Sequence, residues 1–403
     1  MSWEKAKIGD CCEITSSKRI FFSEYVEHGV PFYRSKEIIE RSNGQAISEP
    51  LFISQEKYDE IKRNFGVPQP GDMLLTSVGT IGVPYVLKED DHFYFKDGNL
   101  TWFRKFGDNL ISRYLYYWVQ SSEGQGVLNN TTIGSSQKAL TIASLKSLEI
   151  PCPPIDIQQR IVDILAGYDD LIENNQKQIK LLEEAVRRLY KEWFVDLRFP
   201  GYENTPVVDG VPEGWHIAKL SDVATVNSQS ISKQYSYEFI DYVDLSAVSN
   251  GRIESPTRFS IQEAPGRAKR VASDGDIIWG MVRPNLKSYA LVLHPMETNI
   301  FSTGFAILSA KKVPFSFLYC HVTTDNFVSY LINCTNGAAY PAVKPIHFED
   351  ATLSVPSDDI LNQFHRIAEP MYRKIEILEK QICQAKEARD RLLPKLMNGE
   401  IEV

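Results

Sequence analysis

The chain has 403 residues, of which 43% are hydrophobic and 24% charged, and a formal net charge of −8. The length predicts about two or three domains, and the composition is that of an ordinary globular protein. No apolar run reaches the roughly eighteen residues of a membrane span, and the start, MSWEKAKIGDCCEI, lacks the apolar core of a signal peptide, so we expect a cytoplasmic protein.

The cysteines and the charge exclude some kinds of site. The six cysteines form no C-x-x-C pair and stand near no histidine cluster, so their spacing indicates neither a zinc site nor a disulfide framework. The acidic balance argues against phosphate binding by the chain as a whole. Residues 252–287, however, contain seven basic and four acidic residues, which leaves a local basic face open.

Residues 1–150 are predicted to form a first domain that contains both strands and helices. Short runs such as GVPFYRS, DMLLTSV and VPYVL are rich in β-branched and aromatic residues and are bounded by Gly, Pro and Asp. These runs predict short strands joined by turns, and LISRYLYYWVQSS predicts a helix among them.

The apolar period changes after residue 154. Apolar residues then recur at alternating spacings of three and four, which predicts a long helix with a coiled-coil seam within a spacer of residues 151–200. A single asparagine at a seam position is of the kind that fixes register. The predicted seam residues are Ile161, Leu165, Ile172, Asn175, Ile179, Leu182, Val186 and Leu189.

This helix is predicted to end among aromatic residues. Phe199, Pro200 and Gly201 supply a stop through a proline with fixed φ and a permissive glycine. Trp193 continues the seam, whereas Phe194 and Phe199 need a surface to cover them. We therefore take Trp193, Phe194 and Phe199 as candidate partner-binding residues; the alternative that they pack inside the chain stays open.

The second half of the chain repeats the first. KIGDCCEITSSK from Lys7 resembles KLSDVATVNSQS from Lys219, and Asp72 and Asp276 stand 204 residues apart in similar segments. A second domain is thus predicted over residues 201–355 and a second spacer over residues 356–403. The second seam comprises Met371, Ile375, Leu378, Ile382, Leu392 and Leu396.

The fold class predicted from this repeat is α+β. Two similar globular domains are joined by two long helices, whose matching apolar stripes can bury each other as an antiparallel coiled coil. The expected arrangement has pseudo-twofold symmetry.

The standard motifs of catalysis are missing from the sequence. It has no phosphate-binding glycine loop, no H-E-x-x-H motif and no G-x-S-x-G elbow, and its seven histidines are dispersed. A catalytic site assembled from distant residues remains open, because such sites need not be local in sequence. Binding without catalysis is the simpler hypothesis.

Two loops in each half carry polar residues suited to DNA bases. One loop follows the repeated Gly-Asp turn and the other precedes the long helix. Arg and Lys side chains bind guanine, Asn binds adenine, and Ser or Thr bind bases or phosphate. The DNA-binding candidates are Thr76, Ser77, Thr80, Ser135, Ser136, Gln137 and Lys138 in the first half, and Arg283, Asn285, Lys287, Tyr340 and Lys344 in the second.

Three segments carry a resemblance to a known family. They are IPCPPIDIQQRIVDILAGYDDLIENNQKQIKLLEEAVRRLYKEWFVDLRFPG, the restart VPEGWHIAKLSDVA, and VPSDDILNQFHRIAEPMYRKIEILEKQICQAKEARDRLLPKLMNGEIEV. With these, the chain resembles the specificity subunits of type I restriction-modification enzymes over essentially its full length.

The resemblance implies two target-recognition domains, one for each half of a split site in double-stranded DNA, and no catalysis by this chain. It implies that the helical spacers hold two methyltransferase subunits and, through the complex, restriction subunits. No cofactor would be bound by this chain, whereas S-adenosylmethionine, ATP and Mg²⁺ would be used by the partner subunits. The chain departs from the usual pattern at VPSDDIL, which lacks the proline run, and at Arg389 in the second seam. These departures imply that the two methyltransferase contacts can differ.

Other classes of function stay open from the sequence. One is a structural adaptor whose two domains bind proteins and read no DNA. A weaker alternative is a self-sufficient nuclease or methyltransferase, against which the missing motifs count.

Overall fold

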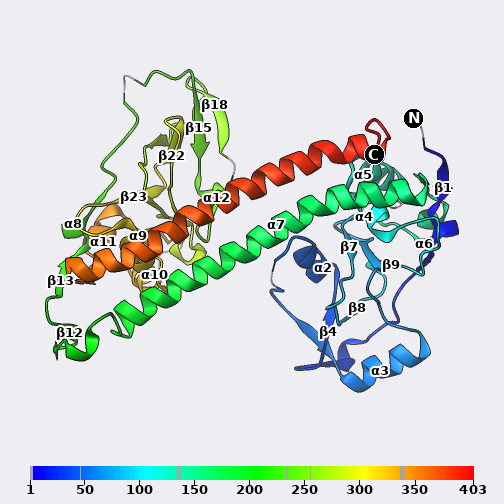
Figure 1. Ribbon diagram of the computed structural model, residues 1–403, viewed down its shortest axis with the longest axis horizontal. Coiled ribbons are helices and arrows are strands. Elements are labelled where there is room, and N and C mark those ends of the chain that lie inside the picture. The colour runs from blue at the N-terminus through cyan, green and yellow to red at the C-terminus, as the bar shows by residue number, and fades with distance from the viewer. Residues whose placement is uncertain are drawn as a thin grey trace. The chain divides into compact units, whose positions relative to one another are not determined.

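Segments far apart in the sequence come together in each of the two units of the chain. The computed structural model describes residues 3–45, 47–132, 134, 138–232, 235–254, 256–335 and 341–403. Unit 1 comprises Met1–Asn175 and Gln381–Val403, and unit 2 comprises Gln176–Lys380. Two long helices, α7 (Ile155–Tyr190) and α12 (Asp358–Met397), each contribute one segment to each unit (Figure 1).

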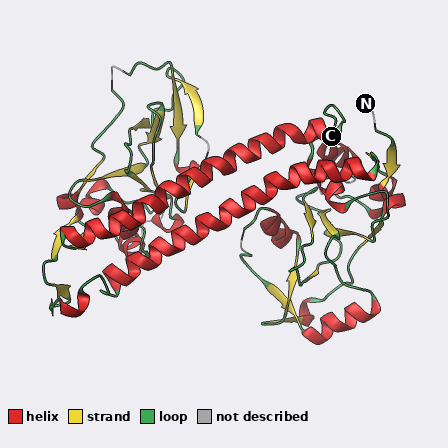
Figure 2. Ribbon diagram, in the orientation of Figure 1, coloured by secondary structure: helices red, strands yellow, loops and turns green. Residues whose placement is uncertain are grey.

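Unit 1 is a mixed domain with two four-stranded sheets, in the orders β2-β9-β6-β7 and β3-β5-β4-β8, and an antiparallel pair β1-β10. Its helices α4 and α5 pack beside the long helices (Figure 2). Its elements are β1 (Lys5–Lys7), α1 (Ile8–Cys11), β2 (Glu13–Thr15), η1 (Phe22–Glu24), β3 (Tyr25–Val26), β4 (Val30–Tyr33), α2 (Ser35–Ser42), β5 (Leu51–Ile53), α3 (Gln55–Asn64), β6 (Met73–Thr76), β7 (Pro84–Val86), β8 (Tyr94–Phe95), β9 (Leu100–Arg104), α4 (Ser112–Gln120), α5 (Ser122–Thr131), α6 (Ile142–Ser147) and β10 (Glu149–Pro151).

Unit 2 also has two four-stranded sheets, in the orders β14-β23-β20-β21 and β18-β15-β22-β19. Two-stranded pairs β13-β24, β16-β17 and β11-β12 accompany them. Its elements are η2 (Lys191–Val195), η3 (Tyr202–Asn204), β11 (Val207–Val208), β12 (Val211–Pro212), β13 (His216–Lys219), α8 (Leu220–Val223), β14 (Ala224–Val226), β15 (Phe239–Val243), η4 (Leu245–Ala247), β16 (Val248–Ser249), β17 (Arg252–Ile253), β18 (Thr257–Ser260), β19 (Ala268–Arg270), β20 (Ile277–Gly280), η5 (Pro284–Leu286), β21 (Tyr289–Leu291), β22 (Asn299–Ser302), β23 (Phe305–Ala310), α9 (Phe315–Val322), α10 (Asp325–Asn333), α11 (Pro345–Glu349) and β24 (Thr352–Val355).

The two units repeat one topology, which confirms the predicted α+β duplication. The order β2-β9-β6-β7 corresponds strand by strand to β14-β23-β20-β21, and the pair β1-β10 corresponds to β13-β24. In the other sheet β5-β4-β8 corresponds to β18-β15-β22, and both versions contain one parallel pair, β4 with β8 and β15 with β22. The fourth strand differs, because β3 lies beside β5 whereas β19 lies beside β22.

The helix segments of each unit pair with each other and run antiparallel. In unit 1 the Asn175 amide donates to Gln381 Oε1 at 3.1 Å, and Arg389 Nη1 lies 2.7 Å from Asp169 Oδ1, so residue numbers rise along α7 as they fall along α12. In unit 2 the Tyr190 ring packs edge-on against the Phe364 ring. The predicted antiparallel pairing is thus confirmed within each unit.

Burial along the predicted seams is uneven. Asn175 is only 2% exposed and makes the polar contact just described. Tyr372 and Leu393 are buried next to the half-buried Met371 and Leu392, so on α12 the deepest positions fall one residue later than predicted at these two places. The predicted residues that are buried are Ile161, Leu165, Ile172, Asn175, Ile179, Val186, Ile375, Leu378, Ile382 and Leu396, and Leu182 and Leu189 are half-buried.

A polar residue holds the start of α7 in unit 1. Gln158 is fully buried; its Nε2 donates to the carbonyls of Asn109 and Pro153 at 2.8 Å, and its Oε1 accepts from the Ile111 N–H at 3.0 Å. The equivalent position in unit 2, aligned through the shared Arg-Ile pair that follows, is Phe364, which is also fully buried. One helix start is therefore fixed by hydrogen bonds and the other by apolar packing.

Arg389, the charged residue in the second seam, is held by a network of three helices. Its guanidinium pairs with Asp169 of α7, and the other oxygen of that carboxylate accepts from the Tyr117 hydroxyl of α4 at 2.7 Å. The Arg389 and Asp169 side chains are each 21% exposed, so both charges are largely removed from water. A half-buried charge is costly without its partner.

We expect Asp169→Ala to lower the free energy of unfolding of unit 1 by about 2–3 kcal/mol, because it removes the buried partner of Arg389 and leaves that guanidinium only the exposed Asp390. The double variant Asp169→Leu with Arg389→Met should recover most of that loss, since apolar side chains can replace a buried pair. Chemical denaturation followed by circular dichroism measures both. Arg391→Ala is the control: this residue is 77% exposed in its pair with Glu387, and its loss should cost under about 0.5 kcal/mol.

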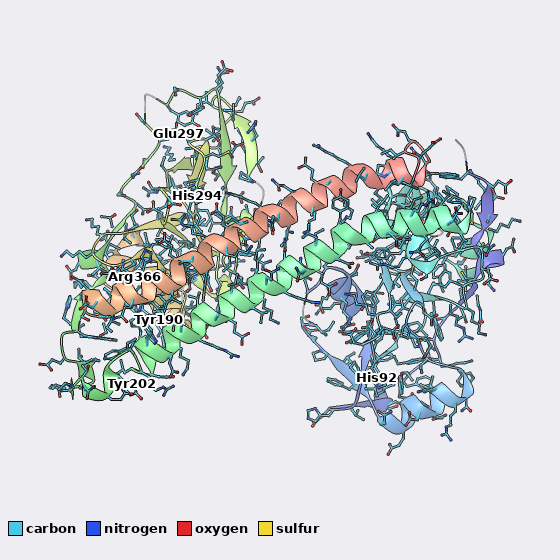
Figure 3. The ribbon with its side chains drawn as sticks, in the orientation of Figure 1. His92, Tyr190, Tyr202, His294, Glu297 and Arg366 are labelled. Atoms are coloured by element: carbon cyan, nitrogen blue, oxygen red, sulfur yellow. The ribbon has the colours of Figure 1, made fainter. Side chains whose placement is uncertain are left out.

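Acid should destabilise unit 2 through a buried histidine. His321 of α9 contacts the Tyr190 hydroxyl through Nδ1 at 3.2 Å, and burial lowers its pKa from the usual 6.5 to about 4 (Figure 3 labels Tyr190). Below pH 6.5 the His321 imidazole becomes protonated in the unfolded chain but stays neutral in the folded unit. The stability due to neutral His321 is therefore complete above pH 6.5 and is lost as the pH falls toward 4, at up to about 1.4 kcal/mol per pH unit.

The measurement is the unfolding free energy between pH 7.5 and pH 4 for the wild type and His321→Gln. The difference between the two should shrink as the pH falls, since the variant has no imidazole to protonate. Glu379, whose pKa burial raises to about 7, acts with the opposite sign but equally in both proteins. His216→Gln, at an exposed position, should run parallel to the wild type, and a parallel His321→Gln curve would contradict the prediction.

Candidate nucleic-acid interface

The two predicted loops of unit 1 lie against each other. Val78, in the turn between β6 and β7, forms an antiparallel bridge with Ala139, in the segment between α5 and α6. The Leu140 N–H donates to the Ser77 carbonyl at 2.9 Å. Segments about sixty residues apart in sequence are thereby joined through main-chain groups at one place.

Within this pair of loops, two candidates turn inward. Thr76 is fully buried and its hydroxyl accepts from the Val83 N–H at 2.9 Å, while Ser77, 2% exposed, has its hydroxyl 2.7 Å from that of Thr101. These hydroxyls hold the turn and cannot reach a ligand, which corrects the prediction for Thr76 and Ser77. Thr80 and Lys138 are exposed, whereas Ser135, Ser136 and Gln137 lie outside the described residues.

The loops of unit 2 are joined in the same way. Val282, after β20, forms an antiparallel bridge with Ala342, before α11. The Arg283 N–H donates to the Pro341 carbonyl, and the Val343 N–H donates to the Met281 carbonyl, both at 2.8 Å. Of the candidates here, Arg283, Asn285 and Lys344 are exposed, Lys287 is half-buried, and Tyr340 lies outside the described residues.

The backbone of the loop around η5 is strained at two bulky residues. Arg283 has φ +50° and Lys287 φ +53°, the left-handed conformation that costs a residue with a Cβ about 1 kcal/mol or more. In unit 1 the corresponding positive φ angles fall on Gly79 and Gly82, where they carry no such cost. Strain that is kept in place by surrounding contacts is often a sign of function.

Lys287 is already engaged by a carboxylate. Its Nζ lies 2.8 Å from Asp325 Oδ1, in the first turn of α10. The pair raises the pKa of Lys287 and lowers the pKa of Asp325. To bind a base or a phosphate, the Lys287 ammonium must share or leave Asp325.

The sequence prediction missed two residues near this loop. Leu286, at the end of η5, is 56% exposed. Arg187 is an exposed residue of α7 whose charge acts on Lys287 and Asp325. Leu286 is an apolar residue within a polar loop, and Arg187 falls outside the apolar stripe of its helix; these were the only signals the sequence offered.

The aromatic end of α7 is covered by unit 2 itself. Trp193 is 8% exposed and Phe199 4% exposed, and the Phe199 ring packs on Trp215 at a centroid distance of 4.9 Å. Phe194 packs edge-on against Phe317 at 4.9 Å and against Phe364 at 5.0 Å. Trp193 and Phe199 are buried within the chain and Phe194 is half-buried, which favours the alternative that these rings pack inside unit 2.

One constellation of catalytic residue types occurs in the described part of unit 2. Ser316 Oγ lies 2.9 Å from His365 Nδ1, and His365 Nε2 lies 3.1 Å from Glu369. Ser316 is fully buried, so no substrate can reach its hydroxyl, and Glu369 is shared with Arg373 at 3.3 Å. The three side chains fasten α9 to α12.

The described residues provide neither a metal site nor a membrane span. No group of three or more His, Cys, Asp or Glu side chains there could hold a metal ion. Within the same part of the chain, no helix is both long and apolar enough to cross a bilayer.

A family model matches the first part of this chain, and known proteins match its full length. The family model for the type I restriction modification DNA specificity domain matches residues 1–184. The type I restriction enzyme MjaIX specificity subunit of Methanocaldococcus jannaschii is 27% identical over 420 residues, covering 100% of this chain and 94% of that protein. The MjaVIII specificity subunit of the same organism is 21% identical over 416 residues, covering 100% of this chain and 93% of that protein.

A solved structure shares the fold. It is the S subunit of a type I restriction-modification system from M. genitalium, which matches with a TM-score of 0.65 at 16% identity and covers 98% of this chain and 96% of that one. The repeat, the shared topology and these matches agree. Residues 1–184 match the type I restriction modification DNA specificity domain, and the whole chain is similar in sequence to specificity subunits of type I restriction enzymes.

Proposed function

We propose that this chain reads a two-part target in double-stranded DNA, with the loop pair of unit 1 on one half and that of unit 2 on the other. The observation that carries the proposal is that both units join the same two loops by the same main-chain bridge, while the exposed side chains differ. Two copies of one frame with different polar side chains suit a target whose halves differ in sequence.

The chemistry of the exposed residues supports direct contact with bases. Arg283 and Asn285 are exposed in unit 2 and Thr80 and Lys138 in unit 1. Arginine and lysine can donate to guanine O6 and N7, and asparagine can pair with adenine N6 and N7. Contacts from Lys344 and Arg187 to phosphates would set the position of the duplex without reading its sequence.

The proposal includes an assembly. The two long helices would hold two methyltransferase subunits, and restriction subunits would join through the complex. This chain would bind no cofactor; S-adenosylmethionine, ATP and Mg²⁺ would be used by the partners, and the methylated adenines would be flipped out of the duplex by the methyltransferases. The exposed apolar residues Ile164 and Leu171 on α7, 38% and 43% exposed, are surface that such a partner could cover.

The test is methylome sequencing of a host that carries this chain with its methyltransferase subunit and has no other type I system. We expect one split motif, with a methylated adenine in each half and a gap of fixed length between them. A contiguous motif would contradict the two-reader proposal. No new methylation, with the complex intact on gel filtration, would favour the protein-binding adaptor instead.

Replacing Arg283 by alanine should weaken binding of the methyltransferase complex to the cognate duplex by roughly 5- to 150-fold, the range for losing one good base contact. Binding to random duplex should fall far less. Fluorescence anisotropy at several salt concentrations measures both. Arg63→Ala, an exposed arginine on α3 of unit 1, is the charge-matched control. If binding to both duplexes fell equally, Arg283 would contact a phosphate and not a base.

A further inference from the structure

The loop of residues 283–287 is fixed in a strained shape by neighbours on several sides. The Arg283 N–H donates to the Pro341 carbonyl at 2.8 Å, and the Asn250 N–H donates to the Lys287 carbonyl at 3.0 Å. The Lys287 side chain reaches Asp325 of α10, and Pro284 at the start of η5 is buried. A loop held in this way presents its exposed side chains in one arrangement.

The apolar side chain at the end of this turn faces solvent. Leu286 is 56% exposed, between the exposed Asn285 and the half-buried Lys287. The rigid backbone leaves it little freedom to fold back onto the unit. In the corresponding turn of unit 1 the exposed residue is Thr80, and Ile81 is half-buried, so the apolar tip belongs to unit 2 alone.

The surroundings of Leu286 favour an anionic ligand. Arg283, Lys287 and Lys344 belong to the joined loops, and the charge of Arg187 acts on Lys287. Among the acids here, Asp325 pairs with Lys287, and Glu183 acts on Arg187, so the four basic residues still outnumber these two carboxylates. A duplex brings phosphates to such a cluster, and in the major groove it also offers one apolar group, the C5 methyl of thymine.

We propose that Leu286 contacts the C5 methyl group of a thymine in the half of the target read by unit 2, and so contributes to sequence specificity. This proposal rests on the proposed function. It adds an apolar contact to the polar ones of Arg283 and Asn285, which flank the same short turn. Deoxyuridine differs from thymidine only in lacking this methyl group, so it isolates the contact.

The experiment uses the complex of this chain with its methyltransferase and a duplex that carries the methylated motif. Each thymine of the motif is replaced in turn by deoxyuridine, and the Kd is measured by anisotropy. We expect one substitution to weaken wild-type binding roughly fourfold, the factor for burying one methyl group. The Leu286→Ala complex should bind both duplexes alike, and Leu286→Met should keep part of the discrimination.

Met296→Ala is the matched control, because Met296 is an apolar residue of unit 2 that is 60% exposed and lies in another loop. It should discriminate as the wild type does. The proposal is overturned if no deoxyuridine substitution weakens wild-type binding, or if Leu286→Ala keeps the full discrimination. Failure of the proposed function looks different, since the wild-type complex would then bind no split duplex selectively.

Discussion

The burial of two long apolar stripes is the constraint on which the rest of this structure depends. Helices of 36 and 40 residues, α7 and α12, cannot leave such stripes in water, and within each unit one segment of each covers the other. Each unit then adds its own helices to the pair. In unit 1 the buried rings of α4 pack with Ile161 and Leu393, and in unit 2 Phe317 of α9 packs on Tyr190. The sheets and their loops are positioned by this packing, and the loops bear the exposed polar residues.

The two units share one topology but differ in the kind of residue at some equivalent buried positions. Gln158 and Phe364 occupy equivalent buried positions, yet one is bound by three main-chain groups and the other by aromatic rings. Phe364 in turn accounts for the aromatic end of α7, because Trp193 and Phe194 pack against it. The starts of the two long helices therefore have different interiors.

Sequence patterns predicted what depends on periodicity and duplication. The α+β class, the repeat and the antiparallel helix pairing follow from spacing, which is visible along the chain. The errors concern the direction in which a side chain points and the segments that cover it. A hydroxyl after a strand looks the same whether it faces solvent or closes its own turn, as Thr76 does with Val83. The cover over Phe194 comes from α9 and α12, more than a hundred residues away, so no local pattern announced it. Arg389 interrupts the apolar seam in the sequence, but in the structure it pairs with Asp169, whose other carboxylate oxygen accepts from the Tyr117 hydroxyl.

The way in which the loops are joined explains how one frame can carry different exposed side chains without losing its shape. The bridges Val78 with Ala139 and Val282 with Ala342 use main-chain groups, and so do the bonds beside them. Main-chain hydrogen bonds place few demands on the side chains that project from the same residues. Thr80 in one unit and Arg283 with Asn285 in the other can thus occupy corresponding loops. This freedom has a limit at Arg283 and Lys287. Both residues adopt a left-handed backbone conformation that glycine adopts in the corresponding loop of unit 1, and they are therefore strained.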